Sequence, residues 1–273
     1  MDQILEKRIF YINSGNQLSG SNNVFTYTAN IPEWGRYNRA TILQASIPVS
    51  YYAVQDGYNH FILTENGSSV TITVPAGNYN VNSFATVVNG LMNSNSPNGY
   101  SYVMKYPISY SQPDTGKFAF TCSNLVSTIT LTFPSSTTIN QQFGFDFDSS
   151  ASYVGGSLTS KNVVSFVPEP TLYLHSNIVS GENDTDVLET FFSANSIPYS
   201  VFTFINPDPI TSSKRLTTRN CRALTFSITD ESGFPIFLNG QDIVFTLCLY
   251  KSNDIYHKAE QYMKYQLNKD LVA

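Results

Sequence analysis

The sequence alternates between apolar and polar residues with a period of two in many short runs. Such runs occupy Phe25–Ile31, Val70–Val74, Thr128–Phe133 and Leu224–Thr229, and threonine fills most of their polar positions. A period of two places apolar side chains on one face of a β-strand and polar side chains on the other. Because a slip of one residue would expose every apolar side chain, the register of these strands is strongly specified. The pattern therefore predicts antiparallel sheets with one buried face.

The strand-like runs are too numerous for one sheet, and turn signals such as Asn66-Gly67 and Asn239-Gly240 separate them. Strands must end at Pro168-Glu-Pro170 and Asn206-Pro-Asp-Pro209, because proline cannot donate to a ladder. We therefore predict an all-β fold, a single jelly-roll β-sandwich of two antiparallel sheets. Further strands are expected near residues 7–13, 40–47, 58–63, 101–108, 117–122, 162–167, 171–175, 200–205 and 243–250.

One short helix is expected within this β pattern, at about residues 82–93. Asn82 is a favourable N-cap, and an apolar stripe that suits packing on a sheet follows at helical spacing: Phe84, Val87, Val88 and Leu91. A shorter helical turn is expected at Asp186–Phe192. Ile255–Leu271 fits either an amphipathic helix or an extended tail. Residues 148–160 hold few core-forming side chains, so we expect a loop there.

The composition excludes several classes of protein. Only 13% of the residues are charged, and the net charge of −5 supplies no basic footprint for nucleic-acid binding. The first residues lack the features of a signal peptide, and no apolar run reaches the ~18 residues of a membrane span, so we expect synthesis and folding in a cytosol. Cys122, Cys221 and Cys248 are widely spaced, and we interpret Cys122 and Cys248 as buried free thiols.

No catalytic motif frames any of the three histidines, His60, His175 and His257. The acidic groups are interpreted as solvated loop residues, although an i, i+2 pair on a strand would suit paired acids or a cation: Asp146 and Asp148, then Asp184, Asp186 and Glu189. We therefore predict no enzyme, no catalytic, cofactor-binding or metal-binding residues, and no cofactor. Several tyrosines fit a carbohydrate platform, a protein interface or a β core equally well: Tyr51, Tyr52, Tyr100, Tyr102, Tyr106 and Tyr110.

Several segments, in order along the chain, resemble one family. They are the extended piece Arg8–Asn16, Leu43-Gln-Ala-Ser-Ile-Pro-Val-Ser-Tyr-Tyr52, the turn Pro75-Ala-Gly-Asn-Tyr79 that opens the helix, Lys161–Val164, and the closing pair of strands Leu224–Tyr250. Together they resemble the penton (vertex) capsid proteins of the double-jelly-roll lineage of DNA viruses, which includes large eukaryotic DNA viruses, virophages and polinton-like elements.

The resemblance implies one jelly-roll domain over residues 1–273, with an N-terminal arm at 1–8, a C-terminal tail at 255–273 and a hairpin formed by the closing strands. It further implies a structural virion protein, a homopentamer at the icosahedral fivefold vertices that contacts the major capsid protein and, as further candidates, minor capsid proteins. The protein would be made in the host cytoplasm and reside in the virion, without binding specific nucleic acid.

The competing interpretation is a β-sandwich module that binds glycans or attaches to a host. Such a site is expected to show tyrosine or tryptophan beside asparagine or aspartate in one loop cluster. The single tryptophan, Trp34, lies in a Pro-Glu-Trp-Gly turn, and it suits an interface anchor or a lid on the core as well as a sugar site. A β-rich hydrolase ranks last, because no motif frames a nucleophile or a base.

Overall fold

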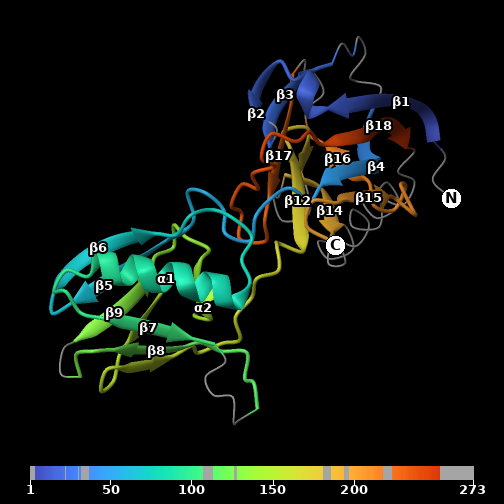
Figure 1. The fold of residues 1–273 in the computed structure, drawn as a ribbon. Coiled ribbons are helices and arrows are strands. Elements are labelled where there is room, and N and C mark those ends of the chain that lie inside the picture. The colour runs from blue at the N-terminus through green and yellow to red at the C-terminus, as the bar shows by residue number, and fades with distance from the viewer. Residues whose placement is uncertain are drawn as a thin grey trace, which may run out of the picture. The chain divides into compact units, whose positions relative to one another are not determined.

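The fold was analysed in a computed structural model that describes residues 4–21, 23–29, 31, 37–106, 113–125, 128–180, 186–193, 197–217 and 223–252. The chain forms two compact units, and each is described by itself. Unit 1 comprises Met1–Ser50 and Pro170–Ala273, and unit 2 comprises Tyr51–Glu169 (Figure 1). Residues 1–273 were expected to form one domain, whereas unit 2 is a separate compact body inserted into the chain of unit 1.

Two antiparallel sheets form unit 1. Sheet A contains, in spatial order, β1 (Ile4–Asn13), β18 (Val244–Ser252), β4 (Arg39–Pro48), β16 (Lys214–Leu216) and β13 (Val179–Ser180), with β15 (Val201–Ile205) also paired to β4. Sheet B contains β14 (Val187–Phe192), β12 (Thr171–Ser176), β17 (Ala223–Thr229), β3 (Val24–Thr28) and β2 (Ser19–Ser21). A short 3₁₀ turn, Ser14–Asn16, follows β1.

The strand order of unit 1 is that of a jelly roll. Its eight principal strands along the chain are β1, β3, β4, β12, β14, β15, β17 and β18. Sheet A brings together the first, eighth, third and sixth of them, and sheet B the fifth, fourth, seventh and second. Two sheets of four antiparallel strands with these long crossings are the jelly-roll arrangement. The predicted fold class is therefore confirmed, with the jelly roll confined to unit 1.

Aromatic rings fill the space between the two sheets. Phe226 of sheet B lies with its ring centroid 5.0 Å from that of Phe245 of sheet A, and Phe25 contacts both rings. The last two strands were expected to form a hairpin. That expectation is wrong, because β17 and β18 lie in different sheets. The connection between them buries Ile236, whose amide bonds the carbonyl oxygen of Ile228, and this lets the chain cross from one sheet to the other.

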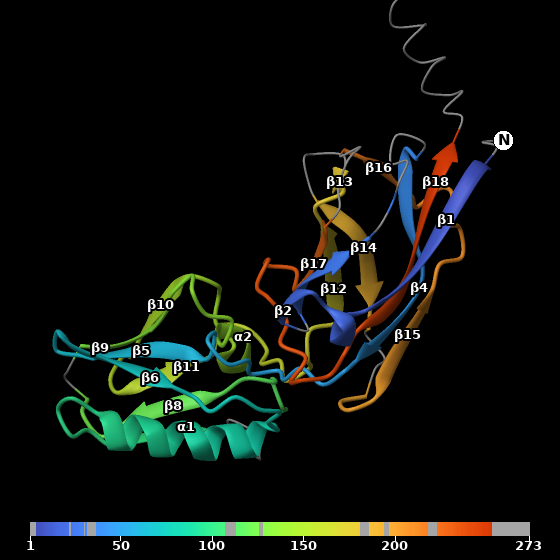
Figure 2. The same ribbon diagram turned by 90° about the horizontal axis from the view of Figure 1, so that it is seen from above.

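Unit 2 is also mainly β, and its core is rich in phenylalanine. One sheet has the order β10 (Ser149–Ser152), β9 (Ile129–Phe133), β5 (His60–Glu65), β6 (Ser68–Thr73), and the other β11 (Ser157–Thr159), β8 (Ala119–Cys122), β7 (Tyr102–Lys105). Helix α1 (Val81–Asn95) contacts β7 and β6 and lies along one side of the unit (Figure 2), and a short helix, α2 (Asn140–Phe143), follows β9. The rings that share the core include Phe61, Phe84, Phe118, Phe120, Phe133 and Phe143.

The predicted helix exists but begins earlier than expected. Asn80, not Asn82, is the N-cap: its side-chain oxygen accepts from the amides of Asn82 and Ser83, and the Ser83 hydroxyl in turn accepts from the Asn80 amide. The face of α1 that is buried most deeply consists of Phe84, Ala85, Val88 and Met92, while Val87 and Leu91 are only partly buried.

Several other local predictions are wrong. Residues 148–160, expected to form a loop, contain β10 and β11, and Asp186–Phe192, expected to be helical, contains β14. Residues 162–167 form no strand. Within the expected N-terminal arm, Ile4 to Arg8 belong to β1 and pair with β18. The tail at 255–273, including His257, lies outside the described residues.

Candidate functional site

His175 joins three elements of sheet B. From β12, its Nδ1 lies 2.7 Å from Oδ1 of Asp186, which precedes β14, and its Nε2 lies 2.9 Å from Oγ1 of Thr229, at the end of β17. A carboxylate, an imidazole and a hydroxyl in a row is the connectivity of a catalytic triad. The sequence did not reveal this grouping, because the three residues come together only through the pairing of β12 with β14 and β17.

The details of the His175 grouping fit a structural clamp better than a triad. The Thr229 hydroxyl donates to the carbonyl oxygen of Asp230 at 3.1 Å, so its single proton is directed away from Nε2. A nucleophile needs the opposite arrangement, with the hydroxyl donating to the imidazole. Moreover, Asp186 is exposed, whereas a triad carboxylate is buried. The imidazole therefore links β12 to the residue before β14 and to the end of β17 through its two ring nitrogens.

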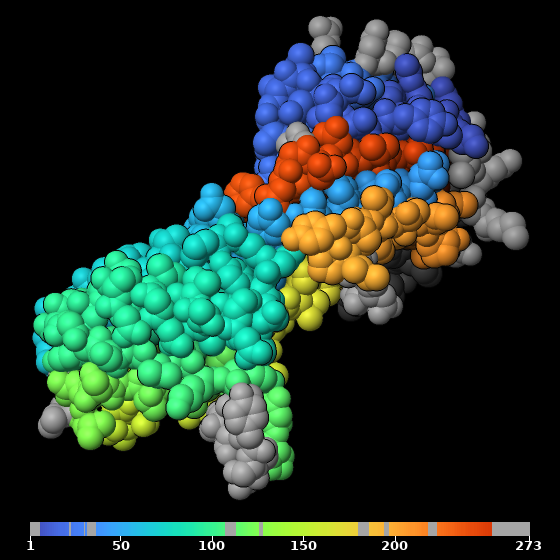
Figure 3. Space-filling model, in the orientation of Figure 1, coloured from blue at the N-terminus to red at the C-terminus, as the bar shows by residue number. Residues whose placement is uncertain are grey.

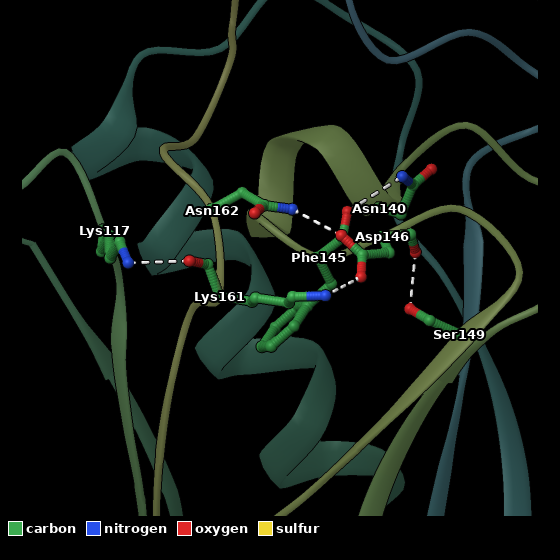
Figure 4. A network of polar contacts seen from close by, with 7 residues as sticks. All are labelled: Lys117, Asn140, Phe145, Asp146, Ser149, Lys161 and Asn162. Atoms are coloured by element: carbon green, nitrogen blue, oxygen red, sulfur yellow. Dashed lines mark hydrogen bonds and ion pairs between the residues drawn. The ribbon is translucent and has the colours of Figure 1, made fainter.

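Asp146 is held in a polar network in unit 2 (Figure 4). One carboxylate oxygen accepts from the Lys161 ammonium and the other from the Asn162 amide at 2.8 Å. These hydrogen bonds, with Lys161 the larger cause, hold the pKa of Asp146 below its usual value. Asp148 lies in a turn with a left-handed backbone, so the two carboxylates do not form the strand pair that a cation site requires. The cation that Asp146 contacts is the ammonium group of Lys161.

The remaining candidates do not assemble a reactive site. Among the described residues, no group of three histidine, cysteine, aspartate or glutamate side chains is placed to hold a metal ion. Cys122 and Cys248 are buried free thiols, as predicted. His60 lies 3.2 Å from the Ser136 hydroxyl, and Glu189 is half-buried in β14, where burial raises its pKa. Asp184, Cys221 and Trp34 lie outside the described residues.

The tyrosines do not gather into one platform. Tyr51 and Tyr102 are buried in unit 2, while Tyr52, Tyr100 and Tyr106 are half-buried. The Tyr106 hydroxyl donates to Asp114, whereas the Tyr100 hydroxyl accepts from Asn66, so Tyr106 and Tyr100 bond to different loops. Tyr110 lies outside the described residues. In the part of the chain that the structure describes, no helix has the length and apolar character needed to cross a bilayer.

Exposed apolar side chains lie on the two edge strands of sheet A, on its outer face. Figure 3 shows β1 in dark blue, β18 in red-orange, β4 in light blue and β15 in orange side by side on this face. On β15, Val201 is 60% exposed and Ile205 72%, and on β1, Tyr11 is 74% exposed. Among the described strands, β15 pairs only with β4 and β1 only with β18. Within the described residues, both strands therefore have one unpaired edge beside exposed apolar side chains.

These two strands share a sequence pattern that sets them apart from the regularly alternating strands. The sequences Val201-Phe-Thr-Phe-Ile205 and Arg8-Ile-Phe-Tyr-Ile12 carry large apolar residues on both faces, whereas Thr128–Phe133 and Leu224–Thr229 place threonine or serine on the outer face. A strand that is apolar on both faces is expected to be covered on both. Unit 1 buries part of the outer face of sheet A, at Thr41 and Tyr250, but the outer sides of β15 and β1 stay exposed and are available to a partner.

Comparison with known proteins finds similarity at the level of structure. No family model matches the chain, and no curated protein sequence matches it. Among solved structures, the chain is similar to the mavirus penton protein, with a TM-score of 0.43 and 11% sequence identity, over 90% of this chain and 99% of that chain. The jelly-roll assignment of unit 1 rests on its own strand order.

Proposed function

We propose that this chain is a structural virion protein, a penton subunit that forms a homopentamer at the icosahedral fivefold vertices and contacts the neighbouring major capsid proteins. The jelly-roll topology of unit 1 supports the proposal, as does the sequence resemblance in Leu43–Tyr52 and Pro75–Tyr79. The role is non-enzymatic and needs no cofactor. It places the protein in the virion after synthesis in the host cytoplasm.

The observation that carries the proposal is the pair of edge strands on sheet A with exposed apolar side chains, β15 without an exposed charge and β1 with one, Lys7. Natural proteins usually protect an edge strand with charge, proline or a covering segment, because an unprotected edge recruits other chains. The exposed residues of β15, Val201, Thr203 and Ile205, include no charge. A closed ring requires two different surfaces on each subunit, one to meet each neighbour. β15 and β1 lie on opposite sides of the β18–β4 pair, so they supply two such surfaces.

The strand register makes the two edges compatible. Tyr11 pairs with Thr246, Thr246 with Gln44, and Gln44 with Ile205, so Tyr11 and Ile205 lie at the same level of sheet A and on the same face. Successive strands are antiparallel, so β1 and β15, three steps apart, run in opposite directions. In a ring whose axis follows the strands, β15 of one copy meets β1 of the next in an antiparallel sense.

Charge placed on either edge tests this proposal. We expect Ile205→Glu and Tyr11→Glu each to convert the pentamer to monomers, because a carboxylate would be buried at every contact of the ring. We expect each contact between neighbouring subunits to lose at least about 1.4 kcal/mol of binding free energy, which lowers its affinity about tenfold. Sedimentation velocity measures the change.

The matched control is Val163→Glu, an equally drastic change at a valine of unit 2 that is 65% exposed. It should leave the assembly intact. If the two edge variants sediment like the wild-type protein at all concentrations, the edges are not the contacts, and the observation that carries the proposal is lost.

A further inference from the structure

Four loops meet at one end of unit 2. The β5–β6 turn at Asn66 is bonded to Thr128 in both directions: the Asn66 amide donates to the Thr128 carbonyl oxygen at 2.9 Å, and the Thr128 amide donates to the Asn66 side-chain oxygen at 3.2 Å. The Asn66 side-chain amide also donates to the Tyr100 hydroxyl at 3.0 Å. A third link joins the amide of Ser123 to the carbonyl oxygen of Ser101.

The fourth loop is the turn between β10 and β11. The Cys122 amide donates to the Gly156 carbonyl oxygen at 2.8 Å, so this turn is attached to the loop that follows β8. Gly155 and Gly156 both have positive φ, which gives the turn a tight form with little side-chain cover. We call this set the loop cluster; its members are Asn66–Gly67, Ser96–Ser101, Ser123–Leu125 with Thr128, and Val154–Ser157.

A fully buried carboxylate orders the loop cluster from beneath. Glu65 Oε1 accepts from the hydroxyls of Ser96 and Tyr102, each at 2.7 Å, and Oε2 accepts from the Asn98 amide at 2.7 Å. Burying a charge is costly for folding, so an apolar side chain would stabilise the domain as well or better. Hydrogen bonds from below that lock a loop in one conformation are the support that binding surfaces need.

The exposed surface of the loop cluster is polar but uncharged. Among its described residues no charged side chain is exposed, since Glu65 is buried beneath it. The loop cluster also exposes two apolar side chains, Leu125 at 67% and Val154 at 82%, and Leu125 lies beside Gly156. Asparagine, serine, glycine and tyrosine on a rigid frame are the residues that binding loops use for adaptable hydrogen bonding. An anionic ligand would need lysine or arginine, which this surface lacks.

We infer that the loop cluster binds a neutral carbohydrate. Sugar hydroxyls both donate and accept, which matches the amides and hydroxyls of Asn98, Ser101 and Ser123. The exposed side chains of Leu125 and Val154 suit the apolar face of a sugar ring. Tyr100 beside Asn66 is the combination of an aromatic residue and asparagine in one loop cluster that a glycan site is expected to show. The inference concerns unit 2 alone and does not depend on the pentamer.

Saturation-transfer NMR on the full chain tests the inference. The probes are neutral sugars (methyl glycosides of glucose, galactose, mannose and N-acetylglucosamine, with lactose and maltose) and two acidic ones, sialyllactose and glucuronic acid. We expect transfer to at least one neutral sugar, and a dissociation constant at least tenfold higher in Leu125→Arg. Val163→Arg, which changes an equally exposed valine near Gly116 of the same unit, is the control and should bind normally.

Three results would overturn the inference: no transfer to any neutral sugar, transfer to the acidic sugars alone, or binding that Leu125→Arg leaves unchanged. Because Leu125 is exposed, its substitution is not expected to affect folding, and the circular dichroism spectrum of the variant checks this.

Discussion

At the scale of the residue, two buried carboxyl groups, those of Glu65 and Asp230, give predictions of stability that can be tested. Glu65 accepts hydrogen bonds from Ser96, Asn98 and Tyr102, and Glu65→Ala would leave all of these donors without a partner. We expect unit 2 to lose about 3 kcal/mol of stability. Native-state hydrogen exchange should then show amides of β5 and α1 exchanging about 100-fold faster, with those of β4 in unit 1 unchanged.

The control for this substitution is Glu231→Ala, which removes an exposed glutamate from a turn of unit 1. It should change stability by less than about 0.5 kcal/mol. Equal effects of the two substitutions would mean that the Glu65 network does not hold the loops of unit 2.

Asp230 gives a prediction that depends on pH. Its Oδ1 accepts from the amides of Ser232 and Phe234, yet burial is the larger influence and raises the pKa of Asp230. The folded state therefore holds the proton more tightly than the unfolded state, so this residue's contribution is complete below about pH 4 and declines as the pH rises through the folded pKa. Asparagine keeps the accepting oxygen and does not titrate.

The expected result is that Asp230→Asn gains stability relative to the wild-type protein as the pH rises from about 4 to 7. Scanning calorimetry of both proteins at several pH values measures the difference in melting temperature. A difference that shrinks over this interval would show that the amide hydrogen bonds, which lower the pKa, outweigh burial.

At the scale of the element, the sequence predicted strands best where alternation is regular. It failed at β14 because this strand contains a bulge: Leu174 pairs with Glu189 and His175 with Val187, which leaves Leu188 as the extra residue. The bulge brings Leu188 and Phe191 to the same buried side, although their spacing of three is typical of a helix. β10 was missed for another reason, since its serines pair with threonines of β9 through hydroxyl groups and supply little apolar signal.

The start of α1 offers a prediction with its own control. Asn80 caps the helix, so Asn80→Ala should cost about 1 kcal/mol, the usual value of an N-cap side chain. Asn82, the residue that the sequence suggested, lies inside the first turn and is exposed, so Asn82→Ala should cost much less. Denaturant unfolding followed by circular dichroism measures both, and the reverse order would contradict the assigned cap.

At the scale of the whole molecule, local pattern could predict the all-β class but not the division into two units. β1 at the start of the chain pairs with β18 near its end, and β4 precedes unit 2 while β12 follows it. Such pairings join distant segments, so no short window of sequence contains them. Pro168-Glu-Pro170 was predicted as a bend, and the boundary between the units lies there.

The same limit applies to the candidate surfaces. The apolar outer faces of β1 and β15 are visible in the sequence, but their position at the edges of one sheet depends on long-range pairing. Likewise, Asn66, Tyr100, Ser123 and Gly156 are ordinary turn residues until the folding of unit 2 brings them into one loop cluster.

The mass of the native wild-type protein tests the central claim most directly. Native mass spectrometry over a range of protein concentrations should show a species of five copies, since the two different edges allow a closed ring and the penton resemblance implies five subunits. A strict monomer at every concentration would contradict the account. A dimer would contradict it as well, since a twofold contact uses the same surface on both copies and leaves the second edge exposed.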